Sequence, residues 1–227
     1  MKKIILIITM VVSTLIMQGC KQGMDLQPQD YFEGTQLDIA TIIYEGDRQK
    51  LDKVLPTVSK ETLNRPAKAD MTLLFWAINN AIFDKNTPER LKIITDLVKA
   101  GADPLQPRPE GRSSPAEYVM KADKGVWIQA MLEGGLSPNA RDEINNQPII
   151  FKSFQAVNTE TLSTLIAYKA DVNIKGAMNR TPLINALYNS CPDSFLSLIS
   201  AEIAKGDKSN AYIKKLIKIK EKIKQVN

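Results

Sequence analysis

The sequence contains no histidine among its 227 residues. This absence excludes catalytic triads and dyads that use an imidazole base, and it excludes metal sites built on histidine ligands. The chain also lacks a glycine-rich phosphate loop and an aspartate cluster with calcium-loop spacing. Its acidic residues are scattered over positions typical of helix caps and loops. We therefore expect no enzymatic activity, no cofactor and no metal.

The N-terminus has the pattern of an export signal. Two lysines at positions 2 and 3 precede an apolar run at residues 4–17, and Gly19 and Cys20 follow it. The run is too short and wrongly flanked for a stable membrane span. The segment Met17-Gln18-Gly19-Cys20 resembles a bacterial lipobox, in which the cysteine becomes the lipid-modified first residue. A simple cleaved signal is the alternative.

The resemblance to a lipobox implies a cellular location as well as a membrane anchor. Residues 1–19 would be the lipoprotein signal peptide, and residues 20–30 would be the lipidated Cys20 and a polar tether. Lys21 stands where an aspartate would retain such a protein in the inner membrane. We therefore expect the protein in the periplasm, anchored to the outer membrane. Internal initiation at Met24 would instead give a cytosolic form.

Cysteine is otherwise scarce, because Cys191 is the second of only two. With Cys20 lipidated, Cys191 has no partner within the chain and no disulfide framework can form. Aromatic residues make up 6% of the chain, so the core is expected to be mostly aliphatic. We interpret Cys191 as a small buried residue of that core rather than a reactive thiol.

The positive net charge comes from the C-terminal tail. Residues 205–227 contain eight lysines and only two acidic residues, Asp207 and Glu221. The segment from Cys20 to the start of this tail is mildly acidic. A basic surface that could bind nucleic acid is therefore not expected on the body of the protein, and no nucleic-acid partner is predicted.

Five segments with similar beginnings recur along the chain. They start at Thr35, Thr72, Ser114, Gln147 and Thr181, at intervals of 37, 42, 33 and 34 residues. A second pattern closes three of the units at positions 101, 135 and 169, which are 34 residues apart. Two coupled motifs that recur at this period indicate stacked helix–turn–helix repeats.

These motifs resemble the ankyrin repeat, whose first helix begins Thr-Pro-Leu-His-x-Ala and whose second helix ends Gly-Ala-Asp-Val-Asn. Only Thr181-Pro182-Leu183 keeps the first three residues, and the motif histidine is replaced in every unit. The resemblance implies an all-α fold, an ankyrin-repeat solenoid of about five helix-turn-helix repeats at residues 31–204. Hairpin-like loops, called fingers here, would join the units, and residues 205–227 would form a basic C-terminal capping helix.

The position just before the last residue of the first motif is expected to point toward the concave face of such a solenoid. Aromatic side chains occupy this position in three successive units, and aromatic residues are enriched at binding hot spots. We predict a partner surface centred on the three aromatic residues. The alternative is that the rings pack between helices. The residues at this position are Ile39, Trp76, Tyr118, Phe151 and Asn185.

The fingers are the second predicted contact region, because such tips commonly contact partners in ankyrin proteins. Taken one at a time, their charged residues are also compatible with ordinary solvated surface. The candidates are Arg108, Glu110 and Arg112 on the longest finger, Arg141, Asp142 and Glu143 on the next, and Lys175, Asn179 and Arg180 on the last.

The C-terminal tail has apolar residues at helical spacing among its lysines. Ile213, Leu216, Ile217 and Ile223 would share one face of a helix. We interpret this helix as a cap on the last repeat. Docking on an anionic membrane or on an acidic partner is the alternative.

The combination of a lipobox with ankyrin-like repeats resembles the layout of immunity proteins of bacterial type VI secretion systems. Such proteins neutralise phospholipase effectors that are delivered to the periplasm. The resemblance implies that this chain binds a secreted lipase or phospholipase effector and blocks its active site, and that it is a monomer when free. The alternatives are a periplasmic scaffold or chaperone for an envelope enzyme or assembly, and a lipid-anchored spacer without a single partner.

Overall fold

The computed structural model describes residues 26–109, 112–189, 191–206 and 211–226. The predicted signal peptide and Cys20 lie outside the described residues, as does Glu110. Helices and loops account for the whole described part, and its one isolated β-bridge joins Arg141 to Pro148. The prediction of an all-α fold is confirmed.

Helices follow one another in pairs through the described part of the chain. The pairs are α2 (Gly34–Glu45) with α3 (Arg48–Val54), α5 (Leu73–Phe83) with α6 (Pro88–Ala100), α7 (Pro115–Met120) with α8 (Val126–Glu133), the 3-10 helix η5 (Ile149–Gln155) with α9 (Glu160–Ala167), and α10 (Pro182–Tyr188) with α11 (Pro192–Lys205). The remaining elements are η1 (Pro28–Asp30), η2 (Leu55–Thr57), α4 (Lys60–Asn64), η3 (Lys68–Asp70), η6 (Ala177–Asn179) and α12 (Ala211–Val226).

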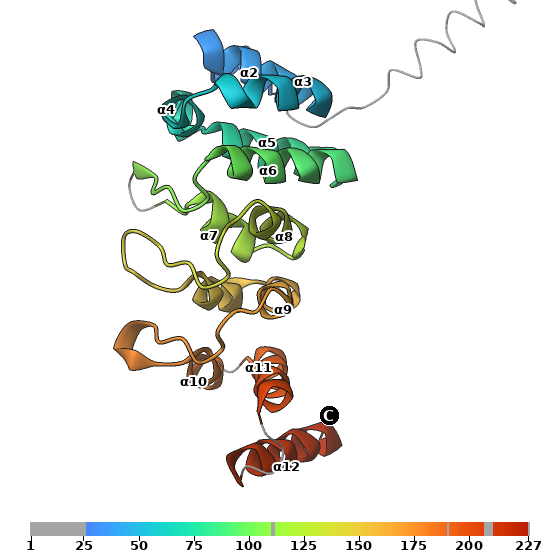
Figure 1. Ribbon diagram of the computed structural model, residues 1–227. Helices are drawn as coiled ribbons and strands as arrows, with labels where there is room; N and C mark the ends of the chain where they lie inside the picture. Colours follow the sequence, from blue (N-terminus) through green and yellow to red (C-terminus); the bar gives the residue numbers. More distant parts are fainter. Residues whose placement is uncertain (1–25, 110–111, 190, 207–210, 227) are drawn as a thin grey trace, which may run out of the picture.

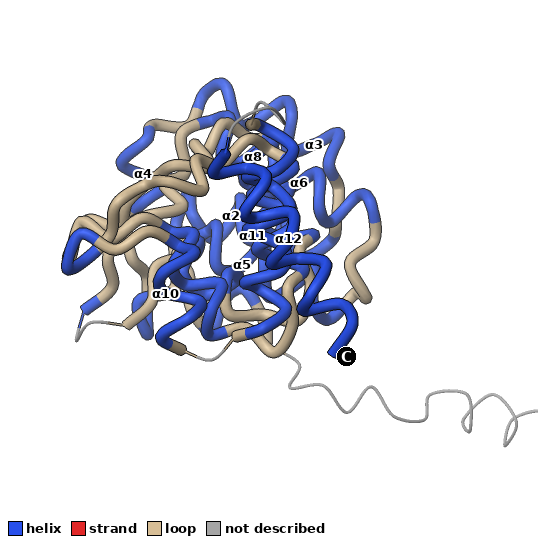
Figure 2. The backbone as a smooth tube through the Cα atoms, turned by 90° about the horizontal axis from the view of Figure 1, so that it is seen from below, coloured by secondary structure: helices blue, strands red, loops and turns tan. Residues whose placement is uncertain are grey.

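The pairs are stacked in chain order, from α2 at one end to α12 at the other (Figure 1). Elements of successive pairs are in contact, since α2 packs on α5, α6 on α8, and α8 on α9. The first helices of the later pairs are neighbours too, because η5 contacts both α7 and α10. Loops that join one pair to the next gather on one side of the stack (Figure 2).

The 34-residue spacing of the sequence corresponds to a repeated backbone geometry. Gly101, Gly135 and Lys169 each follow a second helix, and they adopt positive φ angles of 107°, 113° and 69°. The next residue in each case donates its backbone N–H to the carbonyl five positions earlier, which is the bond of a left-handed helix end. These bonds join Ala102 to Leu97, Leu136 to Met131 and Ala170 to Leu165.

Hydroxyl side chains begin three of the first helices. Thr72, Ser114 and Thr181 each accept a hydrogen bond from the backbone N–H three positions later, as an N-cap residue does. The other two predicted starts differ. Thr35 lies inside α2, which begins one residue earlier, and Gln147 has no hydroxyl with which to cap η5. The first element of the fourth unit is a 3-10 helix instead of an α-helix.

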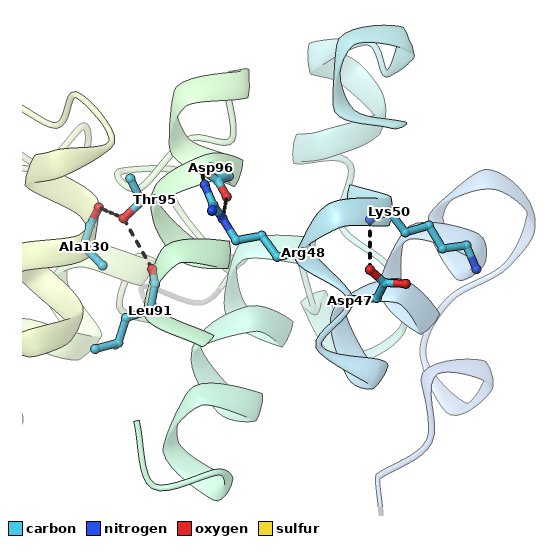
Figure 3. Close-up of polar contacts among 7 residues, drawn as sticks. All are labelled: Asp47, Arg48, Lys50, Leu91, Thr95, Asp96 and Ala130. Carbon is cyan, nitrogen blue, oxygen red and sulfur yellow. Dashed lines mark hydrogen bonds and ion pairs between the residues drawn. The ribbon is translucent and has the colours of Figure 1, made fainter. Parts of the chain in front are cut away.

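Side-chain hydrogen bonds join the second helices of the first three pairs (Figure 3). Arg48 in α3 donates from Nε to Oδ2 of Asp96 in α6 over 2.5 Å. Thr95, beside Asp96, donates from its hydroxyl to the carbonyl of Ala130 in α8 over 3.0 Å. Asp47 caps α3 with its carboxylate. These bonds add directional contacts to an otherwise apolar layer.

The tail forms α12, which packs on α11. Ile213 and Leu216 of α12 are buried together with Ile199 of α11. Within the described residues, no helix has the length and apolar character that a membrane span requires.

Candidate protein-binding face

Trp76 does not form an exposed centre of a partner surface, contrary to that prediction. Its side chain is 1% exposed, and the indole N–H donates to the carbonyl of Ala40 over 2.9 Å. The N-terminal segment folds over it, so that the rings of Tyr31 and Phe32 lie 5.8 and 5.7 Å from the indole. Tyr44 of α2 stacks on it as well. The alternative that this ring packs between elements is correct.

Phe151 and Ile39 are also buried, which corrects two further residues of the predicted surface. The Phe151 ring lies against Gly176, where an added Cβ would come within 2.7 Å of it. Because Gly176 has no side chain, the last finger can close over this ring. Ile39 is in the core with α5, since α2 and α5 pack together. Tyr118 alone among the three aromatic residues is exposed, at 44%, and its ring forms a T-shaped pair with the Phe75 ring of α5.

The longest finger is held by its arginines. Arg108 donates from Nε to the carbonyl of Ser113 over 2.8 Å, and its guanidinium lies 4.1 Å from the centre of the Phe75 ring. Burial and the nearby charge of Arg112 lower the pKa of Arg108. Arg112 is exposed and forms an ion pair with Asp70 of the preceding finger. Arg108 therefore stabilises the finger itself, whereas Arg112 links two fingers.

The next finger also uses its predicted contact residues internally. Asp142 is buried, and its carboxylate accepts from the backbone N–H groups of Asn145 and Gln147 over 2.6 and 3.0 Å. The prediction that Asp142 lies at an exposed tip is therefore wrong, because the turn needs its oxygens. Arg141 donates to the carbonyl of Lys175 over 2.8 Å and so joins this finger to the last one. Glu143 remains exposed.

The last finger keeps two of its predicted residues exposed. Lys175 and Asn179 are exposed, and Asn179 has a positive φ of 56° in the turn. Arg180 is half-buried, with its guanidinium 4.1 Å from the centre of the Tyr188 ring. Tyr188, on α10, is itself 69% exposed. Arg180 thus orients an exposed aromatic ring.

A polar hollow of about 300 Å³ lies between η5 and α10. Asn185 lines it, so this predicted contact residue is half-buried at a concave site. Side-chain amides and one lysine provide hydrogen-bonding groups, and two phenylalanine rings provide apolar walls. The lining residues are Gln147, Phe151, Lys152, Phe154, Gln155, Asn185 and Asn189. Such a mixture of amides and rings suits a peptide loop, whose backbone both donates and accepts hydrogen bonds.

An ion pair lies at the edge of this hollow. Lys152 of η5 occupies the motif position that holds Ala77 in α5 and Ala186 in α10, and its Nζ lies 2.5 Å from Oε1 of Glu117 in α7. Burial acts to raise the pKa of Glu117. The hydrogen bonds from Lys152 and from the Ser114 backbone, with the charge of Lys152, outweigh it and lower that pKa. Glu117 is therefore a stable carboxylate at neutral pH, beneath a lysine that partly faces the hollow.

The lowered pKa of Glu117 predicts a contribution to stability that disappears in acid. In the unfolded chain this carboxyl binds a proton near its ordinary pKa, while in the folded protein its lowered pKa keeps it ionised to lower pH. Its contribution should be complete above the unfolded value and lost as the pH falls through the folded value. Urea unfolding across this range should show a steeper loss for the parent protein than for Glu117→Gln. Equal slopes would contradict the assignment.

Exposed apolar side chains near the hollow were not predicted from the sequence. Tyr188 and Ile184 on α10 are 69% and 39% exposed. They remain exposed because α12 packs on α11, and the described chain adds no further first helix beyond α10. The sequence contained one signal for this exposure: α10 belongs to the last unit of the series, so no further repeat follows to cover it. We name the set formed by Tyr118, Ile184, Tyr188 and the residues that line the hollow, apart from the buried Phe151, the binding face.

No cluster of three potential metal ligands occurs in the described part of the chain. What the binding face provides is hydrogen bonding, aromatic contact and one partly neutralised lysine. These groups lie on α7, η5 and α10, the first helices of three successive pairs, and η5 packs against the other two. In comparisons with known proteins, no family model and no curated protein matches the chain.

Proposed function

We propose that the protein is an ankyrin-repeat lipoprotein that binds and neutralises a secreted lipase or phospholipase effector in the periplasm. The observation that carries the binding part is the binding face, where exposed Tyr118 and Tyr188 lie on the first helices either side of a polar hollow. Exposed aromatic residues beside a concave site are typical of protein-binding surfaces. The nature of the partner rests on the combination of the lipobox and the repeats.

The assignment to ankyrin-type repeats is supported by the recurring geometry of the pairs. Helix ends with the same left-handed turn occur at 34-residue intervals, and three first helices begin at hydroxyl caps in the expected register. In such a solenoid the first helices and the fingers form one extended face. Arginine contacts between fingers would hold that face in one shape before a partner binds, which reduces the entropy cost of association.

Inhibition would result from occlusion of the effector. A loop near the active site of the lipase would enter the hollow between η5 and α10, while Tyr118 and Tyr188 pack on either side of it. Stable inhibitory complexes bury about 1,600 Å² in total, and a face that spans several repeats is large enough. Acylation of Cys20 would hold the inhibitor at the periplasmic side of the outer membrane, where the enzyme attacks lipids.

Co-expression tests the biological role. The proposal predicts that a neighbouring gene encodes a secreted lipase. That lipase should be toxic when directed to the periplasm, and this protein should suppress the toxicity by forming a complex with it. Persistent toxicity together with no complex would refute the immunity function. Binding to a resident envelope enzyme instead would support a scaffold or chaperone role.

Substitution of the two tyrosines tests the binding face. Tyr118→Ala and Tyr188→Ala should each weaken the complex by about 2 kcal/mol, or about thirtyfold in affinity, because exposed rings are replaced without loss of core packing. Phe83→Ala and Val157→Ala are matched controls, since both residues are exposed apolar side chains outside the binding face. Titration calorimetry would measure the affinities. An equal effect of the controls, or no effect of the tyrosines, would contradict the placement of the site.

A further inference from the structure

The exposed side of α12 carries a stripe of lysines. With Ile213 and Leu216 buried against α11, the residues on the opposite side of the helix face outward. Four of these are exposed lysines, at positions that share one side of a helix. They are Lys214, Lys215, Lys218 and Lys222. Glu221 is the only acidic residue of α12, so this side has a strong positive charge.

An apolar edge runs along α12 beside the lysines. Tyr212 and Ile219 are 54% and 39% exposed, and Ile223 lies one helical turn beyond Ile219. Ile223 also lines an open apolar hollow of about 460 Å³ between α12 and the fifth pair. The other residues around this hollow are Ala186, Leu187, Cys191, Pro192 and Phe195. Cys191 was expected to be buried in the core, but it is half-buried and lines this surface.

We propose that this side of α12 binds a membrane surface that contains anionic phospholipids. The lysines would lie among the phosphate groups, and the edge formed by Tyr212, Ile219 and Ile223 would enter the boundary between headgroups and acyl chains. A helix with a cationic stripe next to an apolar strip is the arrangement that lies in a membrane interface. Attraction of clustered lysines to anionic lipid is the main source of affinity in such helices.

Two features favour a lipid surface over an acidic protein or a nucleic acid. All the cations of α12 are lysines, which act as point charges, whereas arginine is the residue that pairs with two oxygens of a defined partner. Tyr212 and Ile219 of the apolar edge are exposed beside the lysines, and their burial is favourable only against a partner that has apolar groups next to its anions. The mildly acidic body would be repelled by the same membrane, so the α12 end is the part that makes contact.

Lipid binding by α12 goes beyond the proposed function and can fail or succeed independently of it. Where Cys20 is acylated, the two contacts would act at opposite ends of the stack, because α2 and α12 lie far apart in Figure 1.

Vesicle sedimentation tests this inference. The chain from residue 21 onward, which lacks both Cys20 and the apolar run at residues 4–17, would be mixed with vesicles of phosphatidylcholine alone or of phosphatidylcholine and phosphatidylglycerol in equal amounts. We expect a preference for the anionic vesicles that salt weakens. Replacing Lys214, Lys215, Lys218 and Lys222 by glutamine should weaken this binding by at least about tenfold. The lysines lie outside the packed side of α12, so the circular dichroism spectrum should not change.

A control with the same change in net charge isolates the position of the lysines. Glutamine would replace four exposed lysines of the body, Lys50, Lys53, Lys92 and Lys99. This protein should bind the anionic vesicles as the parent does. Ile219→Ser should weaken the binding that remains at high salt, since that part depends on the apolar edge. Equal binding by the α12 variant and the control would overturn the proposal, and so would a loss of partner affinity in the α12 variant without any loss of vesicle binding.

Discussion

Replacing Trp76 by alanine is expected to lower the free energy of unfolding by about 3–5 kcal/mol, since it removes a large, fully buried ring and leaves a cavity. The indole is enclosed by Tyr31, Phe32 and Tyr44, which cannot close on the space without moving the N-terminal segment away from α2. The hydrogen bond to the carbonyl of Ala40 is lost as well. Urea unfolding followed by circular dichroism would measure the change.

Tyr118→Ala provides the matched comparison for Trp76→Ala. Both positions are equivalent in the repeat, but the tyrosine is 44% exposed, so its removal should change the unfolding free energy by about 1 kcal/mol or less. Partner affinity should fall more in Tyr118→Ala than in Trp76→Ala, when both are measured under conditions in which Trp76→Ala is still folded. A large loss of partner affinity in the folded Trp76→Ala variant would contradict the buried role of Trp76 and would place it in the binding surface.

Replacing Lys152 by methionine is expected to destabilise the protein by about 3 kcal/mol, because the buried Glu117 carboxylate would be left without its cation. The side chains of Lys152 and Glu117 are only 20% and 11% exposed, so water does little to compensate. Methionine is unbranched and nearly as long as lysine, so the loss of stability should come more from the missing charge than from lost packing.

The double variant Lys152→Met/Glu117→Gln separates the pair from its surroundings. It should recover at least about 1 kcal/mol relative to the sum of the two single changes, because neither charge is then left alone. The unfolding free energies of the four proteins form a double-mutant cycle. Additive losses would mean that the two groups do not interact in solution, and the structural basis for the lowered pKa of Glu117 would be removed.

The repeat pattern was accessible from the sequence because it depends on local chemistry. A hydroxyl residue followed by proline begins α7 and α10 whatever surrounds them, and Gly101 and Gly135 end α6 and α8 because glycine adopts a left-handed conformation without strain. Lys169 shows the limit of this reasoning. It adopts the same left-handed turn with a side chain, held by the backbone bonds of its repeat.

The binding face was only partly accessible. The position of each side chain in its motif identified Tyr118 and Asn185, but it also selected Trp76 and Phe151, which are buried by segments outside their own motifs. Charged finger residues were a weaker guide still. Asp142 and the arginines of the fingers bind backbone and rings nearby, and a sequence does not specify which carbonyls a folded loop will leave unpaired.

By itself the sequence determined the all-α class, the period of the helix pairs and the separation of a basic tail from an acidic body. These follow from residues close together in the chain, where caps, turns and apolar spacing act locally. Only the tertiary structure decided which of the equivalent side chains face solvent. Exposure depends on which other segments cover each position. The N-terminal segment covers Trp76, and the last finger covers Phe151 at Gly176, whereas Tyr188 lies on α10, the last of the first helices, and stays uncovered.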